Sequence, residues 1–155
     1  MYKYIIGVVA SLLLALPAQA STLIVRGDKT HLVKYSEISA LPTLSYETPL
    51  PWVDTTREYT GVTIPTLFAH LEMEIPETLH FRALNDYTIS INRNEILEYK
   101  PIIAYLNNGE RMKIRDKGPY WVIFSLVTHP ELDTPEFHSK MIWQLKEIGT
   151  QDDGW

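Results

Sequence analysis

The amino-acid sequence contains no cysteine. A chain of this kind has no disulfides to hold it together, so its fold must rest on buried apolar side chains and backbone hydrogen bonds. A hydrophobic content of 45% makes such a core feasible. The same absence excludes disulfide exchange, a cysteine nucleophile, iron–sulfur clusters and any metal centre that needs a protein thiolate.

Residues 1–20 have the composition of a secretory signal peptide. Lys3 precedes an apolar run from Ile5 to Leu16, and Ala18-Gln19-Ala20 forms a small-x-small cleavage site. The apolar run is shorter than the roughly 20 residues that span a bilayer. We therefore expect cleavage after Ala20 and export to the periplasm. Residues 21–155 are then expected to form one domain without a transmembrane anchor.

The charge pattern contains one local exception. The net charge of −5 argues against a nucleic-acid partner, which would require a dominant basic surface. Yet the segment RMKIRDKGPYWVIF carries cations at alternate positions: Arg111, Lys113, Arg115 and Lys117. A regular strand would place these side chains on one face, about 7 Å apart.

Two interpretations of this cationic segment stay open. One is a solvated edge strand whose charges prevent edge-to-edge aggregation. The other is an anion site, which Gly118 favours because glycine lets the backbone approach a ligand and offers an unobstructed N–H.

Strand-length apolar segments dominate the chain, with short helical patterns between them. We expect strands at Thr22–Val25, Leu32–Tyr35, Leu79–Ala83 and Tyr87–Ile91, a hairpin turning at Asn107-Asn108-Gly109, and strands within PYWVIFSLV and MIWQLKEIGT. Capping side chains predict helix starts at Thr63, Asn92 and Thr134. The proline-rich stretch from Leu41 to Tyr59 is predicted to be a long ordered loop. This order indicates an α+β fold with a β-rich core, not alternating βαβ units.

Several residues could contact a ligand, although each also has a simpler structural explanation. Trp121 follows the cations and could stack on a flat heterocycle, or it could belong to the core. Trp52 is the better stacking candidate because it lies in the predicted loop. Asn85-Asp86-Tyr87 could pair with the amino-pyrimidine edge of a heterocycle, or it could form a simple turn.

No sequence motif indicates hydrolytic or metal-dependent chemistry. The five histidines show neither an HxH nor an HExxH spacing. No GxSxG, P-loop or GxGxxG sequence occurs either. We therefore expect no metal ion.

Four segments resemble a known family. EYTGVTIPTLF, RALNDYTISI, YLNNGERMKIRDKGPYWVIF and MIWQLKEI occur in the order and spacing of the molybdopterin-binding domain of sulfite-oxidase-like proteins. The resemblance covers Trp52 to Ile148 and is strongest for the small, stand-alone, exported branch of the family. It implies a sulfite-oxidase-type molybdopterin-binding fold, a mixed β-rich core with short helices, in which loops and strand ends form a groove for a pterin.

The missing cysteine separates two functions that the resemblance implies. In the enzymes of the family, a cysteine ligates molybdenum, and this sequence has none. The resemblance therefore favours a non-catalytic periplasmic protein that binds a tetrahydropterin-like ligand without a metal. Such a protein would signal to the periplasmic domain of a membrane sensor, for example a regulator of cyclic di-GMP turnover. The alternative is a molybdopterin-dependent oxidoreductase subunit.

The resemblance, carried over residue by residue, predicts a ligand-binding set. Its members are Trp52, Asn85, Asp86, Tyr87, Arg115, Asp116, Lys117, Gly118, Trp121, Ser139 and Lys140. A tryptophan ring would stack on the pterin, Asp86 or Asp116 would pair with its amino-pyrimidine edge, and the cations would offset an anionic tail. A further interpretation makes the cationic segment a docking face for an acidic protein.

Overall fold

Ten strands form two sheets in the computed structural model, which describes residues 21–151. The predicted signal peptide, residues 1–20, lies outside this range. The first sheet has the order β2-β1-β10-β5-β6, and β1 and β10 are its parallel pair. Its strands are β1 (Thr22–Arg26), β2 (Thr30–Lys34), β5 (Thr78–Ala83), β6 (Thr88–Asn92) and β10 (Leu145–Gly149).

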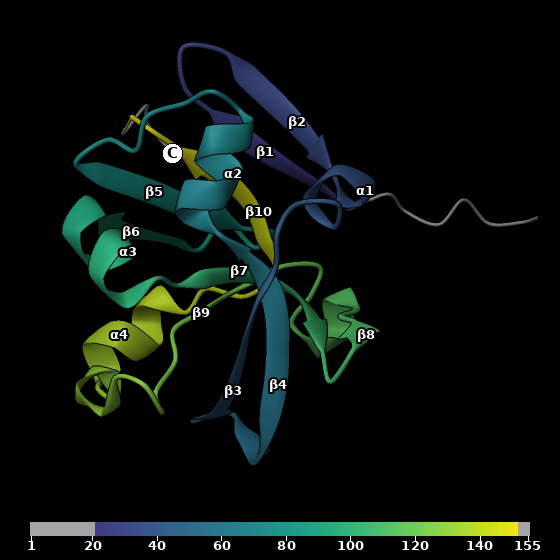
Figure 1. Ribbon diagram of the computed structural model, residues 1–155, viewed down its shortest axis with the longest axis vertical. Coiled ribbons are helices and arrows are strands. Elements are labelled where there is room, and N and C mark those ends of the chain that lie inside the picture. Colours follow the sequence, from purple (N-terminus) through teal and green to yellow (C-terminus); the bar gives the residue numbers. More distant parts are fainter. Residues whose placement is uncertain (1–20, 152–155) are drawn as a thin grey trace, which may run out of the picture.

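The second sheet has the order β3-β4-β7-β8, and β9 pairs with the same edge of β7 as β8, opposite β4. Its strands are β3 (Leu44–Leu50), β4 (Val53–Thr63), β7 (Ile102–Asn107), β8 (Glu110–Arg111) and β9 (Trp121–Ile123). Figure 1 shows β3 and β4 as a long hairpin that runs down from the body of the molecule. The predicted α+β, β-rich architecture is confirmed.

Short helices connect the strands. They are α1 (Tyr35–Ile38), α2 (Ile64–His70), α3 (Arg93–Tyr99) and α4 (Pro135–Lys140), with single 3₁₀ turns at Ile114–Asp116 and Pro130–Leu132. Helices α3 and α4 lie side by side on one flank (Figure 1). No helix of the described residues has the length and hydropathy needed to cross a membrane.

The predicted helix caps are confirmed. The Thr63 hydroxyl accepts the backbone N–H of Thr66 at the start of α2, and the Thr134 hydroxyl accepts that of Phe137 at the start of α4. Asn92 and Glu95 form the reciprocal capping box of α3. Each cap satisfies backbone donors that a helix leaves unpaired, so the sequence signal has a local physical cause.

The predicted long loop from Leu41 to Tyr59 is wrong. Most of this stretch is the β3–β4 hairpin, with Pro51 and Trp52 in its turn. β3 is an edge strand, where a proline removes no ladder hydrogen bond. Pro49 lies where the register between β3 and β4 shifts, so the prolines mark the irregular positions of a hairpin.

The predicted cationic strand is also wrong. Strand β8 ends at Arg111, and a 3₁₀ turn follows at Ile114–Asp116. Lys117 then adopts a left-handed conformation, with φ of 71°. The four side chains therefore do not project from one face of a strand: Arg111, Arg115 and Lys117 line one cavity, and Lys113 does not line it.

Gly118 does not have the free N–H that we expected. Its N–H donates to the carbonyl of Lys113 at 2.8 Å and closes the turn. A Cβ at Gly118 would lie 2.1 Å from the carbonyl oxygen of Met112. Glycine is needed here for close packing of the chain against itself.

A second close approach of this kind occurs in the core, and it gives a test of the packing. A Cβ at Gly61 of β4 would lie 2.0 Å from the carbonyl oxygen of Ile103 of β7. We expect Gly61→Ala to lower the free energy of unfolding by about 1–3 kcal/mol, as overpacking does. Gly109→Ala, at an open position with φ of 79°, should cost about 1 kcal/mol. Urea denaturation measures both, and equal losses would contradict the packing argument.

Candidate functional site

Trp52 lies between two cavities. Its ring centroid is 5.2 Å from that of Trp143, 6.1 Å from that of Trp121 and 5.8 Å from that of His138. It lines both cavities and is 37% exposed. The turn of the β3–β4 hairpin therefore places one aromatic ring in the wall of both cavities.

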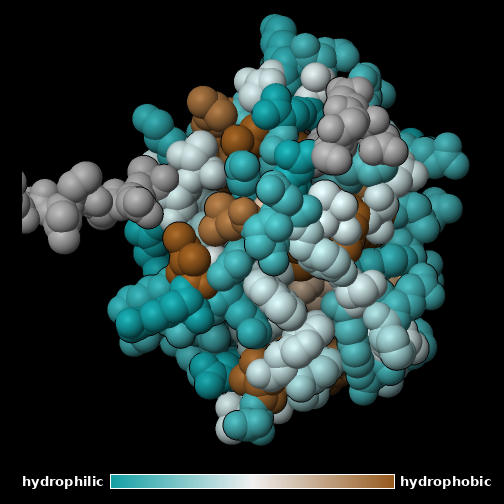
Figure 2. Space-filling view, turned by 180° about the vertical axis from the view of Figure 1, so that it is seen from behind, coloured by the Kyte–Doolittle hydropathy of each residue, from teal (hydrophilic) through white to brown (hydrophobic). Residues whose placement is uncertain are grey.

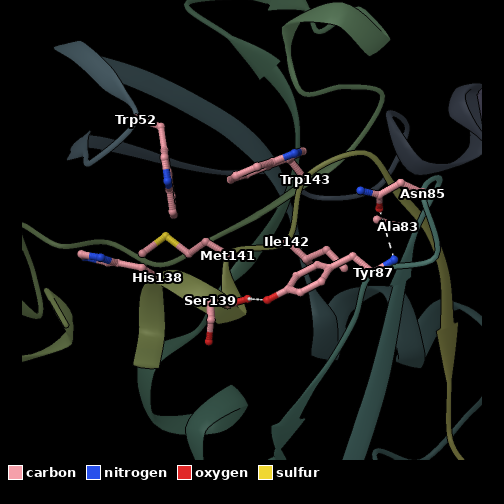
Figure 3. Close-up of a pocket in the computed structure, with 9 residues that line it drawn as sticks. All are labelled: Trp52, Ala83, Asn85, Tyr87, His138, Ser139, Met141, Ile142 and Trp143. Atoms are coloured by element: carbon pink, nitrogen blue, oxygen red, sulfur yellow. Dashed lines mark hydrogen bonds between the residues drawn. The ribbon is translucent and has the colours of Figure 1, made fainter. Parts of the chain in front are cut away.

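The first hollow, which we call the aromatic cavity, has a volume of about 310 Å³. It is lined by Trp52, Ala83, Asn85, Tyr87, His138, Ser139, Met141, Ile142 and Trp143. In Figure 3 the Trp52 and Trp143 rings lie along one side, and Tyr87 and Met141 lie opposite. The volume is at the small end of the range of about 300–1,000 Å³ typical of small-molecule sites.

Polar groups lie at the rim of the aromatic cavity. The Asn85 side-chain oxygen accepts the backbone N–H of Tyr87 at 3.2 Å, which orients the amide so that its nitrogen points into the cavity (Figure 3). The Tyr87 hydroxyl donates to the carbonyl of Ser139 at 3.2 Å. These contacts hold donors and a ring at fixed positions beside an apolar surface.

His138 is a cavity residue that the sequence did not reveal. Its Nε2 lies 2.7 Å from a carboxylate oxygen of Asp133, and its ring is edge-on to Trp52. Asp133 and His138 are five positions apart. They meet because His138 lies in α4, which begins just after Asp133. The pairing fixes the orientation of the imidazole at the cavity wall.

The second hollow, which we call the cationic cavity, has a volume of about 580 Å³. The basic side chains that line it are Arg57, Arg111, Arg115 and Lys117. Asp54, Glu110 and Asp116 also line it, so it is mixed in charge.

Two buried polar atoms of the cationic cavity have no partner. Nε of Arg57 and Oδ1 of Asn107 make no hydrogen bond within the described residues. Burying such atoms unpaired is costly, so a ligand or water that pairs with them would be favoured.

Lys117 connects the two cavities. It lines the cationic cavity, and its ammonium lies 4.5 Å from the ring centroid of Trp143, which lines the aromatic cavity. It also lies 5.9 Å from the ring centroid of Trp121. A charge over an indole face is stabilised by the ring quadrupole.

Gln144 holds the loop between Met112 and Pro119 in place. Its side-chain nitrogen donates to the carbonyl of Ile114 at 2.8 Å, and its backbone N–H donates to the carbonyl of Lys117 at 3.0 Å. Because Gln144 follows Trp143 directly, the loop is fixed next to the aromatic cavity.

The structure divides the predicted ligand-binding set into three groups. The aromatic cavity is lined by Trp52, Asn85, Tyr87 and Ser139. The cationic cavity is lined by Trp52, Arg115, Asp116, Lys117 and Trp121. Neither cavity is lined by Asp86, Gly118 or Lys140.

Trp121 is chiefly a core residue. It is 1% exposed, and its indole N–H donates to the carbonyl of Met141 at 3.1 Å. Asp86 is exposed at a turn, where φ is 65°. Trp52 therefore offers more ring surface to a ligand than Trp121 does.

Five wall residues of the aromatic cavity were not predicted: Ala83, His138, Met141, Ile142 and Trp143. Three of them lie in the MIWQL motif, which the family resemblance had marked without assigning them roles. A strand was predicted within MIWQLKEIGT, whereas β10 begins only at Leu145, so Met141, Ile142 and Trp143 lie in the irregular segment before it.

No protein-family model and no curated protein matches the sequence. In structure, the chain is similar to the sulfane dehydrogenase SoxCD from Paracoccus pantotrophus, with a TM-score of 0.60 at 13% sequence identity. The match covers 83% of this chain and 37% of that chain, so this chain spans little more than a third of the length of its neighbour. The comparison shows a distant relationship of fold.

A molybdenum atom ligated by this protein does not fit the residues present. The chain has no cysteine. Residues 21–151 contain no group of three histidine, aspartate or glutamate side chains arranged to hold a metal ion. The aromatic cavity instead offers ring faces and amide groups, which suit an organic ring.

Lys140 has a structural role that can be tested. Its ammonium donates to Glu95 at 2.6 Å and to Glu136 at 3.1 Å. Burial lowers the pKa of Lys140, but the hydrogen bonds and charges of the two carboxylates outweigh it, so its pKa is raised. The ammonium is therefore committed to linking α4 with α3.

We expect Lys140→Met to lower the free energy of unfolding by about 1–3 kcal/mol, because the half-buried Glu95 loses its charged partner. Glu136→Gln should cost less than about 1 kcal/mol, since Glu136 is largely exposed. Denaturation in urea measures both losses. A Lys140→Met protein with unchanged stability would contradict the structural role.

Proposed function

We propose that the protein is a non-catalytic pterin-binding protein of the periplasm, which signals to a membrane partner. The aromatic cavity, with Trp52 and Trp143 in its wall, carries this proposal. A flat heterocycle could lie against either indole, with an apolar floor formed by Met141 and Ile142. The family resemblance of the surrounding motifs narrows the heterocycle to a pterin.

Asn85 is the group best placed to recognise the pterin edge. Its amide nitrogen points into the aromatic cavity, where it can donate to the ring carbonyl (Figure 3). Asp86 does not line the cavity and is not part of the proposal for pairing. His138, oriented by Asp133, would offer a further polar contact at the opposite wall.

The cationic cavity would hold an anionic tail of the ligand. It shares Trp52 with the aromatic cavity, and Lys117 contacts the ring of Trp143. The unpaired Nε–H of Arg57 could donate to a phosphate oxygen, and the unpaired Oδ1 of Asn107 could accept from a bridging water. A ligand with a flat ring and a charged tail would use both sides of Trp52.

A direct test examines the ligand itself. Protein purified from the periplasm of its native host is denatured, and the extract is analysed for pteridine fluorescence and molybdenum together. We expect a pterin without stoichiometric molybdenum. Stoichiometric molybdenum would favour the oxidoreductase alternative, and an extract with neither would contradict ligand binding in the cell.

We expect Trp143→Ala to weaken the binding of tetrahydrobiopterin by about 5- to 150-fold, because one stacking face is lost. Tyr46→Ala is the matched control, since Tyr46 is an aromatic residue of β3 that lines neither cavity. Isothermal titration calorimetry measures both affinities. If both variants bind tetrahydrobiopterin with equal affinity, Trp143 does not contact the ligand.

Lys117→Met should discriminate between ligands with and without a charged tail. We expect at least about tenfold weaker binding of dihydroneopterin triphosphate, because a charge-assisted contact is lost. Unphosphorylated dihydroneopterin should lose less. Titrations at low and moderate salt give both affinities, and identical losses would contradict a tail site in the cationic cavity.

A further inference from the structure

The loop from Met112 to Pro119 lines a second surface besides the cationic cavity. Lys113, Ile114 and Pro119 belong to a groove of about 470 Å³, which Thr22, Leu84 and Arg111 also line. We call it the docking groove. One loop thus forms part of a ligand cavity and part of a separate surface groove.

Two apolar side chains of the docking groove are exposed at fixed positions. Leu84 is 43% exposed and Ile114 is 49% exposed. The backbone N–H of Leu84 donates to the carbonyl of Gln144 at 2.9 Å, and the Gln144 side chain donates to the carbonyl of Ile114. The backbone of both residues is therefore hydrogen-bonded to the same glutamine. Binding of a partner would cost little conformational entropy at these two positions.

On the face of the protein seen in Figure 2, exposed apolar side chains form small, separate patches. Figure 2 shows brown hydrophobic patches as separate islands within a mostly teal and white surface. Small islands of this kind suit the insertion of one or two side chains rather than a large flat interface.

The charge of the docking groove is the opposite of that of the whole protein. Lys113 and Arg111 line it, and no carboxylate does. Lys113 is exposed and has no ion pair within residues 21–151, while the Arg111 guanidinium lies 3.6 Å from the ring centroid of Tyr35. With a net charge of −5, the rest of the protein repels an acidic partner that this groove attracts.

We propose that the docking groove binds a segment of a partner protein in which one or two apolar side chains are flanked by aspartate or glutamate. The apolar side chains would cover Leu84 and Ile114, and the carboxylates would pair with Lys113 and Arg111. The inference rests on the proposed function for its biological role, because a sensor must present its ligand state to a partner. Because the loop from Met112 to Pro119 lines both the cationic cavity and the docking groove, the ligand and the partner would contact the same loop.

The experiment selects peptides from a randomised phage-displayed library on the purified mature protein. We expect enriched peptides to carry an apolar residue between acidic ones, and to bind Lys113→Glu at least about tenfold more weakly by fluorescence polarisation. Lys29→Glu, the same charge reversal at an exposed lysine of the β1–β2 turn, should bind as the wild type does. Ile114→Ser should weaken binding more than Leu32→Ser, a matched change at an exposed apolar residue of β2.

Three results would overturn the proposal. The first is a selection that enriches no peptide or shows no acidic bias. The second is equal weakening by the groove variants and their controls. The third is self-association in sedimentation that Ile114→Ser abolishes, which would make a second copy of this chain the occupant.

The same variants separate this inference from the proposed function. Lys113 and Ile114 line neither the aromatic nor the cationic cavity. Lys113→Glu and Ile114→Ser should therefore bind tetrahydrobiopterin as the wild type does. If the protein binds the peptide but no pterin, only the proposed function is contradicted. If it binds the pterin but no peptide, only the docking groove is contradicted.

Discussion

The burial of Trp121 positions the whole candidate site. Its indole N–H is satisfied by the carbonyl of Met141, so the chain after α4 is fastened to β9. The ring also lies edge-on to Trp143 and contacts Trp52 at the hairpin turn. Three segments that are far apart in sequence therefore meet at one core side chain. The two cavities lie where these segments meet, which explains why a core residue also lines the cationic cavity.

Close backbone contact shapes the neighbouring loop. The N–H of Gly118 closes the turn on Lys113, and Gln144 fixes the carbonyls of Ile114 and Lys117. Arg115 and Lys117 line the cationic cavity, Lys113 lines the docking groove, and Arg111 lines both. The turn thus supplies both hollows with positive charge.

The local signals of the sequence predicted the fold well. Caps at Thr63, Asn92 and Thr134 depend on residues within one helical turn, so they could be recognised without knowledge of the tertiary structure. The hairpin from Leu44 to Thr63 could not be recognised in this way. Its prolines are tolerated because β3 is an edge strand, and that position is set by the whole sheet.

The candidate site was predicted only in part, for a similar reason. Trp52, Asn85, Tyr87 and Ser139, four members of the predicted ligand-binding set, line the aromatic cavity. Trp143 and His138 were missed because their role depends on which segments pack against them, and periodicity contains no information on that. The resemblance also placed Lys140 in the site, because it precedes the MIWQL motif, although two carboxylates already engage its ammonium.

Three of the four tryptophans of the chain, Trp52, Trp121 and Trp143, touch one another. Indoles at this spacing exchange excitation energy, so light absorbed by any of them can be emitted by another. A ligand ring against Trp52 or Trp143 would change the emission of the group as a whole. The fold thus contains an intrinsic optical reporter at the mouth of its cavities, and no dye would be needed to follow their occupancy.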